Sequence, residues 1–123
     1  MTLQGAKILL IEDEPLIALD VIETLHAAGA TVEGPVRSRA DALRLIDSAA
    51  QGEGWDAVVL DYSLTDGTTE PVAAGLKQQE IPFILHSGLS EKLRPFARRL
   101  DVQLIAKPAP EEVLIQAIHD AMD

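Results

Sequence analysis

The chain has 123 residues, with ten Lys and Arg against twenty Asp and Glu, which gives a formal net charge of −10. Such acidity repels phosphate backbones and anionic lipids, so direct partners among nucleic acids and membranes are not expected. The lack of cysteine excludes disulfides, thiol catalysis and Cys-ligated metal centres. With 47% hydrophobic and 24% charged residues, we expect one globular domain over residues 1–123 and no appended output domain. There is no signal-peptide pattern and no apolar run long enough to span a bilayer, so we expect a cytoplasmic protein.

Short apolar runs alternate with helical patterns along the whole chain. A weak run at residues 31–34, ended by Gly34-Pro35, predicts an edge strand. Four stronger runs predict strands that are buried on both faces of a parallel sheet, namely residues 7–11, 57–60, 81–85 and 102–106.

The segments between these runs carry helix start signals. The expected starts are Pro15, a capping box at Ser38-x-x-Asp41 that precedes Leu43, Ile46 and Ala50, then Pro71 and Pro110. A fourth helix is expected within residues 89–100, where Pro95 allows a start either at Ser90 or at Pro95 itself. The order predicts an α/β fold of (βα)5 type, a doubly wound five-stranded parallel sheet with helices on both faces.

Chemically active side chains follow four of the five predicted strands. Glu12 and Asp13 follow the first strand and Asp61 the third, while Ser87 ends the fourth and Lys107 follows the fifth. Ligands of such sheets bind at the carboxyl ends of the strands, so these side chains are expected to converge. Converging carboxylates repel one another, and a set of few oxygen ligands favours Mg²⁺. Asp61 is then predicted to be a phosphoryl-accepting nucleophile, with Lys107 and Ser87 on the phosphoryl oxygens.

Taken one at a time, each of these residues could be a solvated loop residue, a turn former or a cap. Their joint placement at four strand ends, in the right order, is what favours a function.

The sequence resembles the receiver domains of the two-component response-regulator family, and of their single-domain type, over essentially its whole length. The matching motifs are IEDE around Asp13, VVLD ending at Asp61, HSG around Ser87 and AKP around Lys107. The resemblance implies a flavodoxin-like strand order 2-1-3-4-5. It also implies that Asp61 accepts a phosphoryl group from a phosphohistidine of a sensor histidine kinase or a histidine phosphotransfer protein.

By the same resemblance, Asp13 and Asp61 bind Mg²⁺ directly, Glu12 binds it through water, and the backbone carbonyl of Ser63 completes the protein ligands. Ser87 is then the switch hydroxyl and Lys107 the essential lysine. Such a protein is no enzyme beyond its own phosphorylation and dephosphorylation. Phosphorylation is expected to change the binding of an unknown downstream protein through residues 88–105.

Three positions depart from the family pattern. The loop after Asp61 lacks the usual Pro after its Leu, because Thr65 follows Leu64. Leu104 stands where an aromatic residue usually precedes the lysine, and Ala109 stands where a Phe often follows Lys-Pro. We therefore expect the phosphorylation chemistry to be retained and the aromatic switch to be replaced by re-ordering of residues 88–100.

The same residues bear on three alternative functions. A haloacid-dehalogenase-like phosphatase needs an Asp two residues after the nucleophile as general acid, and Ser63 stands there instead. A nucleotide or FMN binder of flavodoxin type is disfavoured because residues 12–14 are all acidic and would repel a phosphate. A phosphorylation-silent interaction module remains as the third alternative. The sequence does not name the kinase, the target or the oligomeric state.

Overall fold

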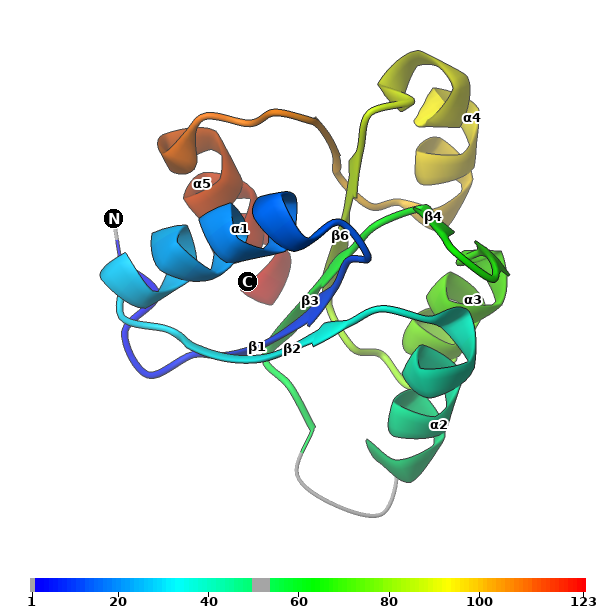
Figure 1. Cartoon of the computed structure of the whole chain (residues 1–123), viewed down its shortest axis with the longest axis horizontal. Coiled ribbons are helices and arrows are strands. Elements are labelled where there is room, and N and C mark those ends of the chain that lie inside the picture. The colour runs from blue at the N-terminus through cyan, green and yellow to red at the C-terminus, as the bar shows by residue number, and fades with distance from the viewer. Residues whose placement is uncertain (1, 50–53) are drawn as a thin grey trace.

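The computed structural model describes residues 2–49 and 54–123 and has a parallel sheet between two layers of helices (Figure 1). The expected helix position Ala50 lies outside the described residues. The strands are β1 (Lys7–Ile11), β2 (Thr31–Val36), β3 (Ala57–Leu60), β4 (Ser63–Leu64), β5 (Gly67–Thr68), β6 (Phe83–Ser87) and β7 (Leu104–Ala106). The helices are α1 (Pro15–Ala27), α2 (Arg39–Ala49), α3 (Glu70–Gln78), α4 (Ser90–Leu100) and α5 (Glu111–Met122).

Five of the strands form one parallel sheet in the order β2-β1-β3-β6-β7. Because β4 and β5 form a separate two-stranded hairpin, this is the predicted order 2-1-3-4-5 with the main strands counted along the chain. The predicted fold class is thus confirmed. None of the described helices has the length and apolarity that crossing a membrane requires.

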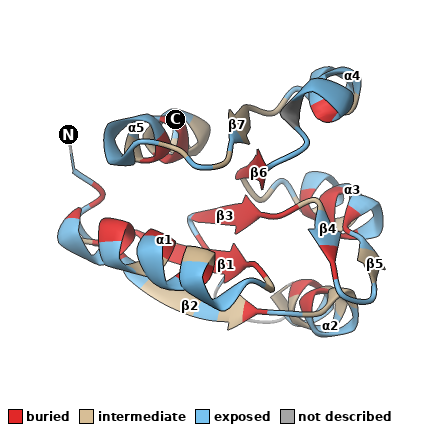
Figure 2. Cartoon of the chain, turned by 45° about the horizontal axis from the view of Figure 1, so that its top comes forward, coloured by how far each residue is buried: buried red, intermediate tan, exposed pale blue. Residues whose placement is uncertain are grey.

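The sheet has a hydrophobic core on each face. Successive β1 residues alternate between the two cores, because side chains along a strand point to opposite faces. Ile8 and Leu10 pack against α1 and α5, whereas Leu9 and Ile11 belong to the core covered by α2 and α3. Figure 2 shows β1 and β3 buried between the two helical layers. The unbroken apolar runs of the sequence reflect this burial on both faces.

Edge strand β2 continues past the point where the sequence predicted its end. Gly34-Pro35 was expected to end it, yet pairing resumes beyond a bulge, with Ile11 opposite Val36. Gly34 has φ +114°, and an added Cβ would lie 2.5 Å from the carbonyl oxygen of Leu10, so only glycine fits the bulge. Pro35 is tolerated because one side of an edge strand needs no donor.

The loop after Asp61 folds into the β4–β5 hairpin, which the sequence did not predict. Asp66 at its turn accepts hydrogen bonds from the backbone N–H groups of Arg39 (2.7 Å) and Ala40 (3.1 Å). These are free donors of the first turn of α2, so the hairpin caps that helix. Ser38 accepts from the N–H of Asp41 at 3.1 Å, which confirms the acceptor half of the predicted capping box.

Helix α4 begins at Ser90 and contains Pro95, which decides between the two predicted starts. It ends at Asp101, whose left-handed backbone (φ +54°) lets its N–H reach the carbonyls of the last turn. Leu93 and Ala97 are its buried side chains in the part of the helix whose burial is described. Helix α4 therefore packs on the sheet through Leu93 and Ala97, with Phe96 and Leu100 partly buried beside them.

Candidate functional site

Three carboxylates converge at the carboxyl ends of β1 and β3. One oxygen each from Glu12, Asp13 and Asp61 lie within 4.8 Å of one another. Glu12 is 1% exposed and Asp61 6% exposed, so two of the three charges lie below the surface. The structure thus brings together the carboxylates that the sequence placed after two different strands.

Backbone pairing fixes where these carboxylates lie. The N–H of Asp61 donates to the carbonyl of Ile11 (3.0 Å), which continues the β1–β3 ladder by one residue. The N–H of Glu12 donates to Val36 (2.9 Å), which continues the β1–β2 ladder past the bulge. The N–H of Glu14 donates to Oε2 of Glu12 (3.2 Å) and orients that carboxylate. The acidic groups are therefore fixed by the sheet and not by flexible loops.

Lys107 brings a positive charge to the cluster from the end of β7. Its Nζ lies 2.6 Å from Oε1 of Glu12 and 3.3 Å from Oδ2 of Asp61. Its backbone N–H donates to the carbonyl of Ser87 at 3.0 Å, which joins the segment after β7 to the end of β6. The ammonium is shared between the two carboxylates and lies closer to Glu12.

Burial and the charges around them shift the pKa values of Glu12 and Asp61 in opposite directions. Burial, aided by the hydrogen bond and the charge of Glu12, raises the pKa of Asp61 to about 7 against the opposing pull of Lys107. Burial also acts to raise the pKa of Glu12, but its hydrogen bonds with Lys107, Asp61 and Glu14 outweigh it and the net shift is downward. Burial lowers the pKa of Lys107, yet the two carboxylates more than compensate and leave it raised. Asp61 therefore loses its proton less easily than Glu12 does.

The remaining predicted residues line the same pocket, which has a volume of about 500 Å³. Ser87 is 3% exposed, and its Oγ accepts the N–H of Leu89 at 3.0 Å, next to the start of α4. Ser63 lies at the opposite wall in β4, with its N–H 3.5 Å from Oδ1 of Asp61. All six residues singled out in the sequence therefore gather at one end of the sheet.

Two residues that the sequence analysis did not single out hold the loop after Asp61. Thr69 is fully buried, and its hydroxyl donates at 2.7 Å to the carbonyl of Asp61 and also lies 3.0 Å from that of Tyr62. The hydroxyl of Tyr62 donates to Glu70, and its ring meets Phe96 of α4 edge to face, with centroids 5.7 Å apart. A buried threonine eight residues after the acceptor has no local sequence signature that would have revealed it.

The donor set fits a hard divalent cation. Its side-chain donors are the carboxylate oxygens of Glu12, Asp13 and Asp61, and one ammonium offsets only part of their charge. A cation held by Asp13 and Asp61 would favour the charged form of Asp61, against the burial and the charge of Glu12 that raise its pKa. Chemically, the arrangement can bring an anionic electrophile up to an aspartate between a cation and a lysine.

Comparisons with known proteins point to one kind of domain. No family model matches the chain. It is 34% identical over 106 residues to the phyllosphere-induced regulator PhyR of Methylorubrum extorquens, which covers 85% of this chain and 39% of that protein. It is 35% identical over 121 residues to the sensor protein TorS of Escherichia coli, which covers 94% of this chain and 13% of that protein. The chain therefore spans well under half the length of these relatives.

A solved structure matches along nearly the full length of both chains. The response regulator receiver protein from Sinorhizobium medicae superposes with a TM-score of 0.83, covers 98% of this chain and 97% of its own, and is 26% identical. The agreement therefore extends over the sheet, the helices and the edge that carries the acidic cluster.

Proposed function

Because this chain is a receiver domain of the two-component response-regulator family, we propose that Asp61 accepts a phosphoryl group from a phosphohistidine and that this changes partner binding. The observation that carries the proposal is the meeting of Asp61 with Lys107 and two further carboxylates at one edge of the sheet. The family membership supports a role in two-component signalling, and the geometry supports Asp61 as its acceptor.

Mg²⁺ is the cofactor we propose, held directly by Asp13 and Asp61, through water by Glu12 and by the carbonyl of Ser63. The contact of Glu12 with Lys107 at 2.6 Å supports the outer position, since that carboxylate already has a cationic partner. When bound, the ion supplies positive charge against the phosphoryl oxygens. It also favours the ionised form of Asp61, which is the nucleophilic one.

The transfer proceeds by attack of a carboxylate oxygen of Asp61 on phosphorus. The P–O bond to Asp61 forms as the P–N bond to the donor imidazole breaks, and the imidazole leaves as a neutral base after taking a proton from solvent. Lys107 then pairs with the phosphoryl oxygens in place of the Asp61 oxygen that has become bonded to phosphorus. The hydroxyl of Ser87, which accepts from Leu89 before transfer, turns to donate to a phosphoryl oxygen.

This movement of Ser87 would reach α4 through Leu89, the residue that precedes the helix. When Ser87 turns away, the N–H of Leu89 loses its acceptor, so Leu89 and the first turn of α4 can rearrange. Leu104 has no ring to turn inward, so we propose that the order of residues 88–105, and not a side-chain flip, changes the surface offered to a downstream protein.

The partner that supplies the phosphoryl group is a sensor histidine kinase or a histidine phosphotransfer protein. Leu16, 82% exposed at the start of α1 and beside the acidic loop, is the anchor we propose for that partner. An exposed leucine alone is unremarkable, but its position next to the acceptor pocket makes it reachable by a docked donor helix.

The test is incubation with acetyl phosphate, with and without Mg²⁺, followed by intact-mass measurement. The wild type should gain one phosphoryl group only with Mg²⁺, and Asp61→Asn should gain none. Asp47→Asn, an exposed carboxylate change on α2, is the matched control and should label like wild type. Labelling of Asp61→Asn at the wild-type rate would contradict the assignment.

A further inference from the structure

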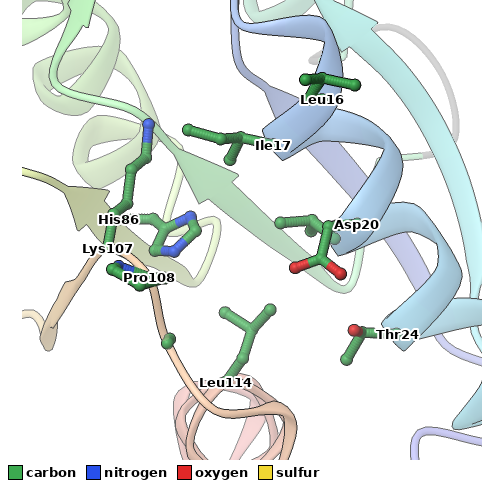
Figure 3. Close-up of a pocket in the computed structure, with 10 residues that line it drawn as sticks. Leu16, Ile17, Asp20, Thr24, His86, Lys107, Pro108 and Leu114 are labelled. Atoms are coloured by element: carbon green, nitrogen blue, oxygen red, sulfur yellow. The ribbon is translucent and has the colours of Figure 1, made fainter.

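A second cavity lies between α1 and α5, on the other side of Lys107 from the acidic pocket. Its volume is about 300 Å³, at the lower end of the range for small-molecule sites. Its walls are mostly apolar, with Ile17 and Val21 on α1 and Leu114 on α5 (Figure 3). An engineered cavity of about half this volume, in another protein, holds a benzene ring. The cavity can therefore hold one ring with a short substituent.

His86 forms the inner wall of this cavity and has no hydrogen-bond partner. The side chain is 4% exposed, and neither ring nitrogen is bonded to another residue that the structure describes. In Figure 3 the ring points from β6 toward the space between α1 and α5. Burial, together with the charge of Lys107, lowers the pKa of His86 to about 4, against smaller opposing effects of Glu12 and Asp20. The ring is neutral, and one of its nitrogens has a free lone pair.

Asp20 gives the cavity a negative charge. Its carboxylate comes from α1, is exposed at the open side of the cavity and points toward it in Figure 3, and it forms no ion pair with another described residue. The other charged residue in the wall is Lys107, whose ammonium contacts Glu12 and Asp61 and so belongs to the acidic pocket. Thr24, buried one turn further along α1, adds a hydroxyl to the same wall. The polar groups facing the cavity are thus able to accept hydrogen bonds, and the net charge is negative.

From this combination we propose that the cavity binds a small organic cation, an amine or amidine carried on a one-ring apolar body. The body packs on Ile17, Val21 and Leu114, the charged N–H groups donate to Asp20, and His86 and Thr24 provide further acceptors. A neutral alcohol of the same shape would keep the packing and lose the ion pair, and a carboxylate would be repelled. This site is distinct from the phosphoacceptor site, and its ligand binding does not require Asp61.

The cavity is nevertheless adjacent to the phosphoacceptor site. Ile17 and Lys107 line both the cavity and the acidic pocket. A bound ligand would therefore pack against the stem of the lysine whose ammonium lies 3.3 Å from Asp61.

The experiment is an amide-shift titration of the ¹⁵N-labelled chain with three probes that share one ring: benzylamine, benzyl alcohol and phenylacetate. Benzylamine should bind best and shift the amides of α1, His86 and residues 107–114, with benzyl alcohol weaker and phenylacetate weakest. Because Asp20 is exposed, Asp20→Asn should weaken benzylamine about threefold and leave benzyl alcohol unchanged. Glu23→Gln removes a carboxylate from the same helix outside the cavity and should change neither. His86→Leu keeps the apolar wall and should weaken both probes that can donate a hydrogen bond.

Equal binding of the three probes, or shifts confined to other surfaces, would overturn the proposal. So would unchanged benzylamine affinity in Asp20→Asn. If that variant does not fold, the order of the three probes on the wild type decides alone. The titration is repeated on Asp61→Asn, where binding should persist, so a failure of phosphorylation would not be mistaken for a failure of this site.

Discussion

Helices α1 and α4 both begin beside the acidic pocket, but they are held to the sheet in different ways. Helix α1 starts at Pro15, has an unbroken helical pattern and buries Ala18, Val21, Thr24 and Leu25. Helix α4 contains Pro95 and buries Leu93 and Ala97 in its described part. Helix α1 therefore buries more side chains than α4, where Phe96 and Leu100 are only partly buried and a proline interrupts the helical hydrogen bonds, so α4 should resist rearrangement less.

The exposed faces of the two helices differ as well. Helix α1 exposes Leu16 and Leu19, whereas α4 exposes a cluster of basic side chains, which are Lys92, Arg94, Arg98 and Arg99. A fixed apolar face suits a partner that must align with Asp61, since alignment requires rigidity. A weakly attached charged helix suits a surface whose order changes. The contrast suggests that input and output use different helices beside the same aspartate.

The largest expected effect is on the input helix. Leu16→Ala should slow phosphotransfer from a phosphorylated histidine donor roughly 30-fold, or about 2 kcal/mol, because the anchor of the docked helix is lost. Labelling by acetyl phosphate, which needs no docking, should be unchanged. Both rates come from intact-mass time courses.

The control for Leu16 is His26→Ala, an exposed change at the far end of α1 that should leave both rates alone. Equal slowing with both donors would mean that Leu16 acts through the fold, and the distinction between a docking helix and a responding helix would weaken.

The next effect concerns the stability of α4. Pro95 cannot donate a helical hydrogen bond, so Pro95→Ala should slow amide exchange in residues 90–100 about tenfold. The gain is below the full cost of an internal proline because alanine also adds freedom to the unfolded chain. Exchange in α1 should not change. If α4 is already as protected as α1 in the wild type, the contrast between the two helices is wrong.

A third effect concerns the acidic edge that both helices share. The pKa of Asp61 rises on folding from 3.8 to about 7. At low pH the folded and the unfolded chain both hold the proton, so there the shift has no effect on the free energy of unfolding. As the pH rises through this window, the unfolded chain ionises first and the folded state loses stability. Asp61→Asn should therefore be about 1 kcal/mol more stable than wild type at pH 7 and no more stable near pH 4.

The gain from Asp61→Asn is kept small because Lys107 loses one of its two carboxylate partners. Urea melts at several pH values measure it. Mg²⁺ should bind only the folded wild type and raise its stability. It should therefore reduce the difference in stability between wild type and Asp61→Asn. A pH-independent gap would mean that Asp61 is ionised in the folded protein.

The sequence predicted those features that depend on neighbouring residues in the chain. Apolar runs buried on both faces predicted the strands, and the ends of the strands predicted which carboxylates would meet. It was insufficient where a distant contact decides. Pairing with β1 carries β2 through Gly34-Pro35, and the bonds from Asp66 to α2 fold the loop after Asp61 into a hairpin.

The same limit applied to the site. The sequence identified Glu12, Asp61 and Lys107, but it could not show that burial and the charge of Glu12 raise the pKa of Asp61, nor that the lysine lies closer to Glu12 by less than 1 Å. The outward turn of His86 into a second cavity depends on which face of β6 its side chain occupies, and the continuous apolar run left that open.

The smallest expected effect tests how α4 senses the acceptor. Tyr62 follows Asp61 directly, and its ring meets Phe96 at 71° with centroids 5.7 Å apart. An aromatic contact of this kind contributes about 0.5–1.5 kcal/mol. Phe96→Leu should therefore speed exchange in α4 a few-fold and reduce the change that beryllofluoride induces there, and Tyr62→Leu should do the same. Both remove the same ring contact, and the bond that Tyr62→Leu also removes goes to Glu70 on α3, so exchange in α4 should be no faster in the double variant than in either single variant. Leu104→Tyr puts a ring at the position where relatives of this domain usually have one, and it should leave the response of α4 unchanged, since Tyr62 already makes the contact. If Leu104→Tyr alters the response while Phe96→Leu does not, the signal passes along β7, and α4 follows a change made elsewhere.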